Sequence, residues 1–208
     1  MNKNLKEIIR RLDKNYPDAK TDLIHKSPFQ LLVAVILSAQ CTDERVNIVT
    51  KELFKKYKTP EDFINIALEE LEKEIYSTGF YKNKAKNIKL MAQTLMDKFN
   101  GKVPDRMEDL IILAGVARKT ANVVLGSAFG KVEGIVVDTH VIRLSQRLGF
   151  TKNTNAEKIE QDLMKIIDKK EWFKFSYDLI QHGRKVCNAK KPLCTKCFLN
   201  DICPSVNT

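Results

Sequence analysis

Residues 113–140 read LAGVARKTANVVLGSAFGKVEGIVVDTH, and this stretch decides the fold. Its pattern predicts a short apolar helix over 105–113, a tight turn, and a second helix from Arg118 to a left-handed cap at Gly130. Helices commonly begin with a Ser, Thr, Asp or Asn that accepts a first-turn amide hydrogen bond. The second helix has no such residue. Its open amides, together with Arg118 and Lys119, therefore predict a binding site for phosphate.

Lys119 and Asp138 are the candidate catalytic residues of this stretch. Lysine is almost fully protonated at neutral pH and is then no nucleophile. A place in the first turn of a helix, beside Arg118, disfavours the charged form of Lys119, and partial burial would add to this effect. Asp138 precedes the amphipathic segment VIRLSQRLG, where it is a good helix N-cap with a fixed carboxylate. Taken singly, Lys119 is also explained as a phosphate or solvent contact, and Asp138 as a cap only.

The composition favours a polyanionic partner. The 208 residues carry a formal net charge of +10, although a Lys-rich composition can also reflect codon usage alone. The N-terminal segment is amphipathic and charged, without the apolar core of a signal peptide. The longest apolar run, Leu31 to Leu37, is too short to cross a bilayer. We therefore expect a cytoplasmic protein with no membrane partner, in a compartment where thiols stay reduced.

Helical periodicity extends along the whole chain, and no segment shows the alternation of a strand. The fold class is therefore predicted to be all-α. The predicted helices cover the N-terminal segment to residue 14, the segments that begin at Pro28, after Thr42 and at Pro60, and residues 71–75, 81–99, 141–148, 155–167 and 171–186. Their Met and aromatic stripes are interpreted as core.

Four of the five cysteines lie close together near the C-terminus. They are Cys187, Cys194, Cys197 and Cys203, with the spacing C-x6-C-x2-C-x5-C. So many thiols in a reducing compartment indicate a metal site, and four-cysteine zinc is the general expectation for such a set. The remaining cysteine, Cys41, is predicted to be a small buried helix residue, with oxidation sensitivity as the alternative.

The stretch RKTANVVL followed by VDTHV resembles the endonuclease III family of helix-hairpin-helix DNA glycosylases. The family pattern is close to L-P-G-V-G-R-K-T-A-N-V-V-L, and this chain departs from it at Ala114 and Ala117. The resemblance implies a six-helix domain over 21–131 that contains the hairpin. Residues 1–20 and 132–208 would form a second helical domain. It implies that Lys119 is the nucleophile and that Asp138 is its carboxylate partner, facing it across the cleft between the domains.

The same resemblance implies the cofactor and the contacts with DNA. The cysteine spacing, after the stretch HGRKVC, coincides with the family's [4Fe–4S] loop, which would make Cys187, Cys194, Cys197 and Cys203 cluster ligands with a structural role. The predicted DNA-binding residues are Gln40, Phe80, Gly115, Val116, Ala117, Arg118, Lys190 and Lys191. Gln40 would fill the gap left by an extruded base, and Phe80 would be a wedge in the opposite strand. By themselves, Gln40 is also explained as a helix-end residue, Phe80 as a core-packed loop anchor, and the two lysines as solvated charges.

The function implied is that of a bifunctional DNA glycosylase and AP lyase in base excision repair. It would remove oxidised pyrimidines from double-stranded DNA, and act at abasic sites, through a Schiff base and β-elimination. We expect a monomer that associates with the nucleoid when bound to DNA. One alternative is a mismatch glycosylase, but the adenine-removing relatives lack the lysine at position 119 and have an additional C-terminal domain. The other is a non-enzymatic, redox-responsive DNA-binding module.

Overall fold

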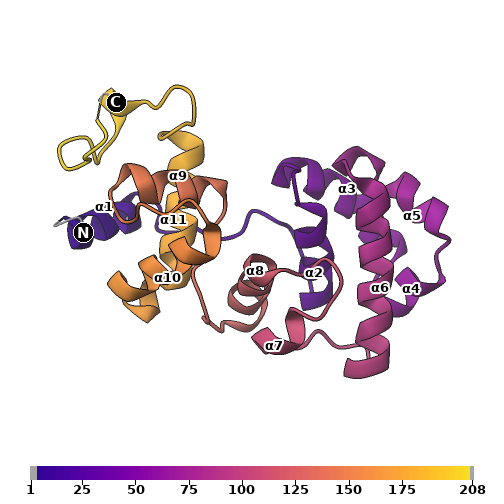
Figure 1. Ribbon diagram of the computed structural model, residues 1–208. Coiled ribbons are helices and arrows are strands. Elements are labelled where there is room, and N and C mark those ends of the chain that lie inside the picture. The colour runs from indigo at the N-terminus through magenta and orange to yellow at the C-terminus, as the bar shows by residue number, and fades with distance from the viewer. Residues whose placement is uncertain (1–3, 207–208) are drawn as a thin grey trace. The chain divides into compact units, whose positions relative to one another are not determined.

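The computed structural model describes residues 4–206, and within that range it is built of α-helices and short 3-10 helices with no β-strand (Figure 1). The all-α prediction is confirmed. The α-helices are α1 Leu5–Asn15, α2 Pro28–Leu37, α3 Asp43–Lys56, α4 Pro60–Asn65, α5 Leu68–Glu74, α6 Tyr81–Phe99, α7 Met107–Leu110, α8 Arg118–Phe129, α9 Thr139–Arg147, α10 Ala156–Ile166 and α11 Trp172–Lys185. The 3-10 helices are η1 Tyr76–Thr78, η2 Lys169–Glu171 and η3 Cys194–Lys196.

The chain divides into two compact units. Residues Asp22–Lys131 form one, here called the central unit, and it contains α2 to α8. Residues Met1–Thr21 and Val132–Thr208 form the other, the C-terminal unit. The described part of the central unit holds seven α-helices, of which α4, α5 and α7 are short.

The central unit is organised around α2 and α6. Ser27 caps α2, and Pro28 occupies its first position, where a missing amide hydrogen costs nothing. Most of α2 is apolar and buried on all sides, so it forms the middle of the core. On α6, Ile88, Met91 and Leu95 are buried, and this helix lies between α2 on one side and α4 and α5 on the other (Figure 1).

Helix α7 is shorter than predicted. It covers only Met107–Leu110, because Arg106 is still extended and because the chain leaves the helix after one turn. The amides of Leu113 and Val116 then bond the carbonyls of Leu110 and Leu113, each three residues back, which tightens the chain into the hairpin turn.

The C-terminal unit packs α1 and α9 against α11. Its core includes Ile8 and Leu12 from α1, Leu144 from α9, and Phe175 and Leu179 from α11, all almost fully buried. Between residues 4 and 206, no helix combines the length and the apolar character that a membrane span requires.

Candidate nucleic-acid interface and catalytic residues

The hairpin between α7 and α8 presents its backbone and keeps its apolar side chains inside. Leu113 and Val116 are buried, whereas Gly115 and Ala117 are exposed. The buried side chain of Val116 therefore does not reach the surface, and its amide bonds the carbonyl of Leu113 within the turn. Gly115 has φ 78°, and a Cβ atom there would lie 3.1 Å from the Cβ atom of Asn87, so this position requires glycine.

Helix α8 begins without a side-chain cap, as predicted. Its N-cap residue, Ala117, makes no side-chain hydrogen bond, and the helix ends at Gly130 with φ 64°. Ala117 itself has φ −88° and ψ 169°, a conformation open to any residue. Alanine at position 117, where the family pattern has its second glycine, therefore causes no backbone strain.

Lys119 is exposed, so the partial burial considered for it is wrong. Asn122 and Val123, three and four residues further along α8, are buried, so Lys119 is exposed because it lies in the first turn, at the end of the helix. Its place in the first turn of α8, next to Arg118, agrees with the prediction.

Asp138, in the C-terminal unit, is the N-cap of α9. Its Oδ1 atom accepts hydrogen bonds from the amides of His140 at 2.8 Å and Val141 at 2.9 Å. The side chain is half-buried, and both bonds use the same oxygen, which fixes the direction of the carboxylate. Burial lowers the pKa of His140, and the charge of Asp138 acts in the opposite direction.

The position of α9 depends on a close approach to α11 at Gly183. A Cβ atom on Gly183 would lie 2.8 Å from Nδ1 of His140 and 3.0 Å from Nη2 of Arg143. Arg143 donates to the carbonyls of Gly183 at 3.0 Å and Cys187 at 2.9 Å, and so ties α9 to the end of α11. His140 supplies one of the two amides that orient Asp138.

We predict that Gly183→Ala slows base release because the added methyl group moves His140 and, with it, Asp138. Overpacking of this kind costs about 1–3 kcal/mol of folding free energy. The measurements are thermal unfolding and single-turnover base release well below the unfolding temperature. Leu163→Ala in α10 is the control, because it removes a fully buried side chain from the same unit without touching α9 at Asp138. Equal base release by the two variants would contradict the positional argument.

Gln40 and Phe80 both lie in turns of the central unit and have left-handed backbones. Gln40 has φ 53° and is exposed, three residues beyond the end of α2. Phe80 has φ 48° and its side chain is 64% exposed, so its interpretation as a core-packed anchor is wrong. Cys41 is half-buried in the turn before α3, and its prediction as a buried helix residue is also wrong.

The four C-terminal cysteines line one cavity. Apolar residues complete its wall, among them Leu148, Val186 and Leu199, and so do Arg147 and His182. No three His, Cys, Asp or Glu side chains among residues 4–206 are arranged to hold a single metal ion. Burial raises the pKa of the Cys197 and Cys203 thiols, and the neighbouring cysteines add to the shift.

Hydrogen-bond donors surround these sulfur atoms. Nη1 of Arg147 lies 3.2 Å from Sγ of Cys187, and Nε2 of His182 lies 3.4 Å from Sγ of Cys197. The other ring nitrogen of His182 is 3.0 Å from the hydroxyl of Tyr16, and burial lowers the pKa of His182 to about 4. A neutral His182 that accepts from Tyr16 donates to sulfur. Donors aimed at sulfur suit thiolates bound to a metal group.

Sequence reasoning missed Tyr16, Arg147 and His182. Tyr16 lies far from the cysteines along the chain, and no spacing rule connects it to them. His182 is part of the stretch HGRKVC, five residues before Cys187, but spacing did not show which way its ring points.

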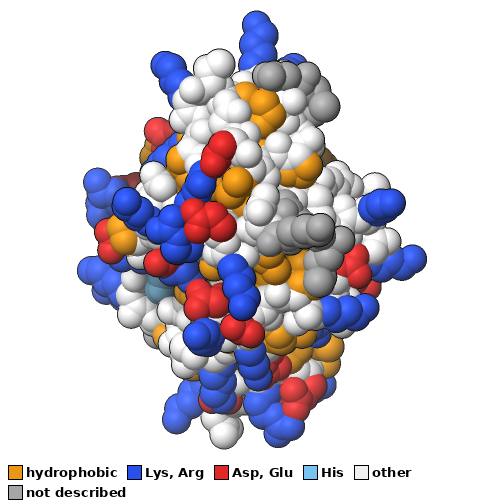
Figure 2. All heavy atoms as spheres, turned by 90° about the vertical axis from the view of Figure 1, so that its left-hand side faces the viewer, with side chains coloured by type: hydrophobic (Ala, Val, Ile, Leu, Met, Phe, Trp, Pro, Cys, Tyr) orange, Lys and Arg blue, Asp and Glu red, His pale blue; other side chains and the backbone are white. Residues whose placement is uncertain are grey.

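The loop between Cys187 and Cys194 has a fixed backbone and exposed lysines. Arg147 donates to the carbonyls of Asn188 at 2.8 Å and Ala189 at 2.9 Å, while Lys190 and Lys191 are exposed. On the face that Figure 2 shows, Lys and Arg side chains project around and between Asp and Glu side chains. Positive and negative side chains are mixed on this face, so the net positive charge of the chain does not identify it as a DNA-binding surface.

Comparison with known proteins gives consistent matches over nearly the whole chain. The family described as HhH-GPD superfamily base excision DNA repair protein matches residues 33–169. Endonuclease III of Synechocystis sp. is 55% identical over 199 residues, which are 96% of this chain and 91% of that protein. The structure of a non-covalent endonuclease III–DNA complex matches with a TM-score of 0.94 and 48% identity, covering 99% of this chain and 96% of the other. A trapped covalent endonuclease III–DNA intermediate, in an estranged-adenine complex, gives the same values.

Proposed function

The chain belongs to the endonuclease III family of the HhH-GPD superfamily, and we propose that it is a bifunctional DNA glycosylase and AP lyase that removes oxidised pyrimidines from duplex DNA. The observation that carries this proposal is the 48% identity, over 99% of the chain, to an endonuclease III trapped covalently on DNA. The lysine at the start of α8 and the carboxylate at the start of α9 supply the chemistry that such an intermediate needs.

Phosphate binding begins at the hairpin. The uncapped first turn of α8 directs backbone amides outward, and the exposed Gly115 and Ala117 leave room for a phosphate to approach them. Arg118 adds a cation at the same place. The hairpin thus holds the DNA backbone beside the lesion while the nucleotide turns out of the stack.

Gln40 and Phe80 support the opened duplex. Extrusion of a base costs a few kcal/mol of lost stacking and pairing, and side chains that enter the gap recover part of it. Both residues are exposed on left-handed turns, so neither must leave a core position to reach DNA. Lys190 and Lys191 add phosphate contacts from the C-terminal loop.

Lys119 and Asp138 carry out the reaction. Asp138 stabilises the positive charge that develops on the sugar as the base leaves. Lys119 first loses its proton to solvent. The neutral Nζ atom of Lys119 attacks C1′ as the bond from C1′ to the base breaks. The product rearranges to a Schiff base, which allows loss of a C2′ proton and β-elimination of the 3′ phosphate.

The test of this function uses three duplexes of one sequence, which contain an oxidised thymine, an abasic site or a G·A mismatch. The proposal predicts base release and strand cleavage on the first, cleavage on the second, and no base release on the third. Base release from the mismatch alone would identify a mismatch glycosylase. Binding to all three without reaction would identify a DNA-binding module.

The four cysteines that line the C-terminal cavity are the proposed ligands of a [4Fe–4S] cluster. Support comes from the family resemblance and from the donors of Arg147 and His182 directed at sulfur. When bound, the group supplies a covalent cross-link between the end of α11 and the last residues of the chain. Helix α1 holds the same region, because Arg11 pairs with Asp201 and donates to the carbonyl of Phe198.

We predict that Cys194→Ser removes most of the visible absorption and iron from the purified protein and lowers the folded yield. Loss of a ligand frees the cross-linked segment, and the expected fall in unfolding temperature is about 10 °C. Iron analysis, the absorption spectrum and thermal unfolding measure these effects. Cys41→Ser is the matched control, because Cys41 lies outside the cavity. A stable Cys194→Ser protein with full iron content would contradict the assignment.

A further inference from the structure

Lys84, near the start of α6, is a buried lysine that neither phosphate binding nor the reaction uses. Its side chain is only 4% exposed, and its Nζ atom donates to the carbonyls of Leu37 and Thr78, each at 2.8 Å. Its own amide donates to the carbonyl of Phe80 at 3.1 Å. Burial lowers the pKa of Lys84, and the nearby Cys41 acts in the opposite direction. Removing an ammonium group from water costs free energy, so a buried lysine is expected only where its hydrogen bonds serve the structure or the function.

The two carbonyls that Lys84 binds belong to the two segments that present Gln40 and Phe80. Leu37 is the last residue of α2, three residues before Gln40. Thr78 is the last residue of η1, two residues before Phe80. A single ammonium therefore joins two turns that are forty residues apart in sequence.

Both turns are strained just beyond the point where Lys84 holds them. Gln40 and Phe80 have φ of 53° and 48°, a left-handed conformation that is unfavourable for residues other than glycine. Such conformations persist only where the surroundings fix them. The exposed side chains of Gln40 and Phe80 provide little such fixation. Local backbone bonds hold each turn by itself, and the Nζ atom of Lys84 bonds to the segments of both.

We propose that Lys84 is a positioning residue for base extrusion, holding the two turns at a fixed separation so that Gln40 and Phe80 enter the duplex together. This inference rests on the proposed function, because it takes both residues as the ones that support the opened duplex. If the two turns are already ordered in the free protein, no conformational entropy has to be lost to order them while the base is being extruded. Lys84 touches neither the substrate nor the reacting atoms.

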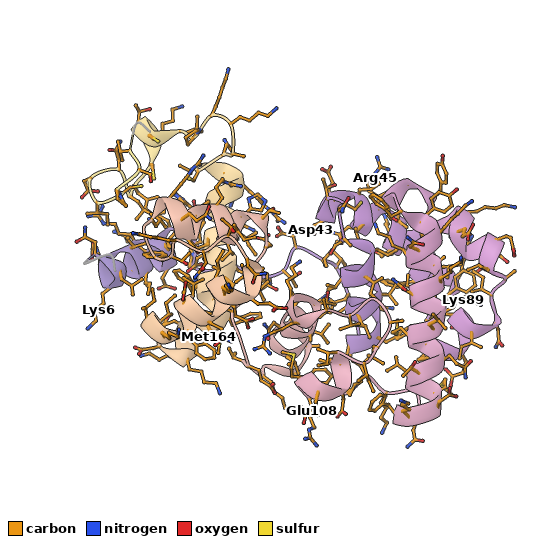
Figure 3. All side chains as sticks on the ribbon, in the orientation of Figure 1. Lys6, Asp43, Arg45, Lys89, Glu108 and Met164 are labelled. Atoms are coloured by element: carbon orange, nitrogen blue, oxygen red, sulfur yellow. The ribbon has the colours of Figure 1, made fainter. Side chains whose placement is uncertain are left out.

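Helix α6 supplies a matched control for a purely structural role. Lys89 is a second lysine whose Nζ atom caps a helix end, donating to the carbonyls of Phe63, Ile64 and Ile66 at 3.1, 2.7 and 2.5 Å. Figure 3 shows Lys89 on the side of α6 that faces α4 and α5. Both lysines thus stabilise helix C-termini, but only Lys84 holds the turns of Gln40 and Phe80.

The experiment compares Lys84→Met and Lys89→Met in the full chain. Methionine keeps the unbranched shape of lysine and removes its donors. Single-turnover strand cleavage is measured on the duplex with an oxidised thymine and on the duplex with an abasic site, which has no base left to extrude. Thermal unfolding of each variant sets a temperature at which all are folded.

We expect Lys84→Met to lower the rate on oxidised thymine about tenfold more than the rate on the abasic site. Lys89→Met should change both rates by the same factor. Equal factors for Lys84→Met would overturn the inference while leaving the proposed function intact. Inactivity of the native chain on both duplexes would instead overturn the proposed function.

Two further measurements apply if Lys84→Met does not fold. Lys84→Gln retains N–H donors on a shorter side chain, and it should show a smaller effect in the same direction. On the native chain, backbone hydrogen exchange of residues 38–41 and 79–81 should slow together when a duplex with a stable abasic-site analogue binds. Slowing of one segment without the other would contradict a shared constraint.

Discussion

Replacing Lys119 by Ala is expected to lower strand cleavage at an oxidised pyrimidine by roughly 10³-fold or more, with less than about a tenfold loss of DNA affinity. The reaction loses its nucleophile, whereas the amides of the hairpin and Arg118 still hold the phosphate. Lys119 is exposed in the first turn of α8, so the fold should be unaffected. Single-turnover cleavage and fluorescence anisotropy measure the two effects.

The variant Lys119→Arg distinguishes two roles of Lys119, that of the nucleophile and that of a cation that only contacts phosphate. Arginine keeps the positive charge beside the hairpin but does not form a Schiff base. We expect it to bind DNA nearly as well as the native chain and to be as inactive as Lys119→Ala. Lys102→Ala, at an exposed lysine of the same unit, is the control and should retain full activity. An active Lys119→Arg variant would show that position 119 serves only to hold phosphate.

Asp138→Asn should slow base release by about 10²-fold or more, and weaken DNA binding only a few-fold. The amide oxygen of Asn can accept the same two hydrogen bonds from His140 and Val141, so α9 keeps its cap. What is lost is the negative charge opposite the developing cation on the sugar. The measurement is single-turnover base release at saturating enzyme, together with the dissociation constant for the same duplex.

The control for this prediction is a variant that removes a helix N-cap elsewhere in the same unit. Asn155→Ala removes the N-cap of α10 in the same unit, where the side chain accepts the amide of Lys158. It should cost about 1 kcal/mol of stability and leave base release unchanged. Unchanged base release in Asp138→Asn would show that Asp138 is a cap only, and equal losses of base release and DNA binding would also contradict its catalytic role.

Local sequence rules predicted much of the fold. The bounds of α6 agree with the prediction for 81–99, because its apolar stripe is long and Asn100-Gly101 ends it. The helices predicted to begin at Pro28, after Thr42 and at Pro60 do so, with Ser27, Thr42 and Thr59 as their N-caps. These features depend on residues three or four positions apart, which a sequence shows directly.

The sequence did not show features that depend on contacts between distant segments. The bonds of Lys84 to α2 and η1 and the hydrogen bond between Tyr16 and His182 join residues far apart in the chain. The left-handed backbone of Phe80 was also missed, because phenylalanine rarely adopts it without tertiary constraint. The exposure of Lys119 was also missed, because the residues three and four positions further along α8, Asn122 and Val123, are buried and give no sign of it.

The central claim is that Lys119 forms the covalent intermediate, and borohydride trapping tests it most directly. The native chain, Lys119→Ala and Lys102→Ala are each incubated with a duplex that contains one abasic site, reduced, and separated by denaturing electrophoresis. We predict a stable protein–DNA adduct from the native chain and from Lys102→Ala, and none from Lys119→Ala. An adduct of equal yield from Lys119→Ala would show that another amine is the nucleophile and would contradict the account.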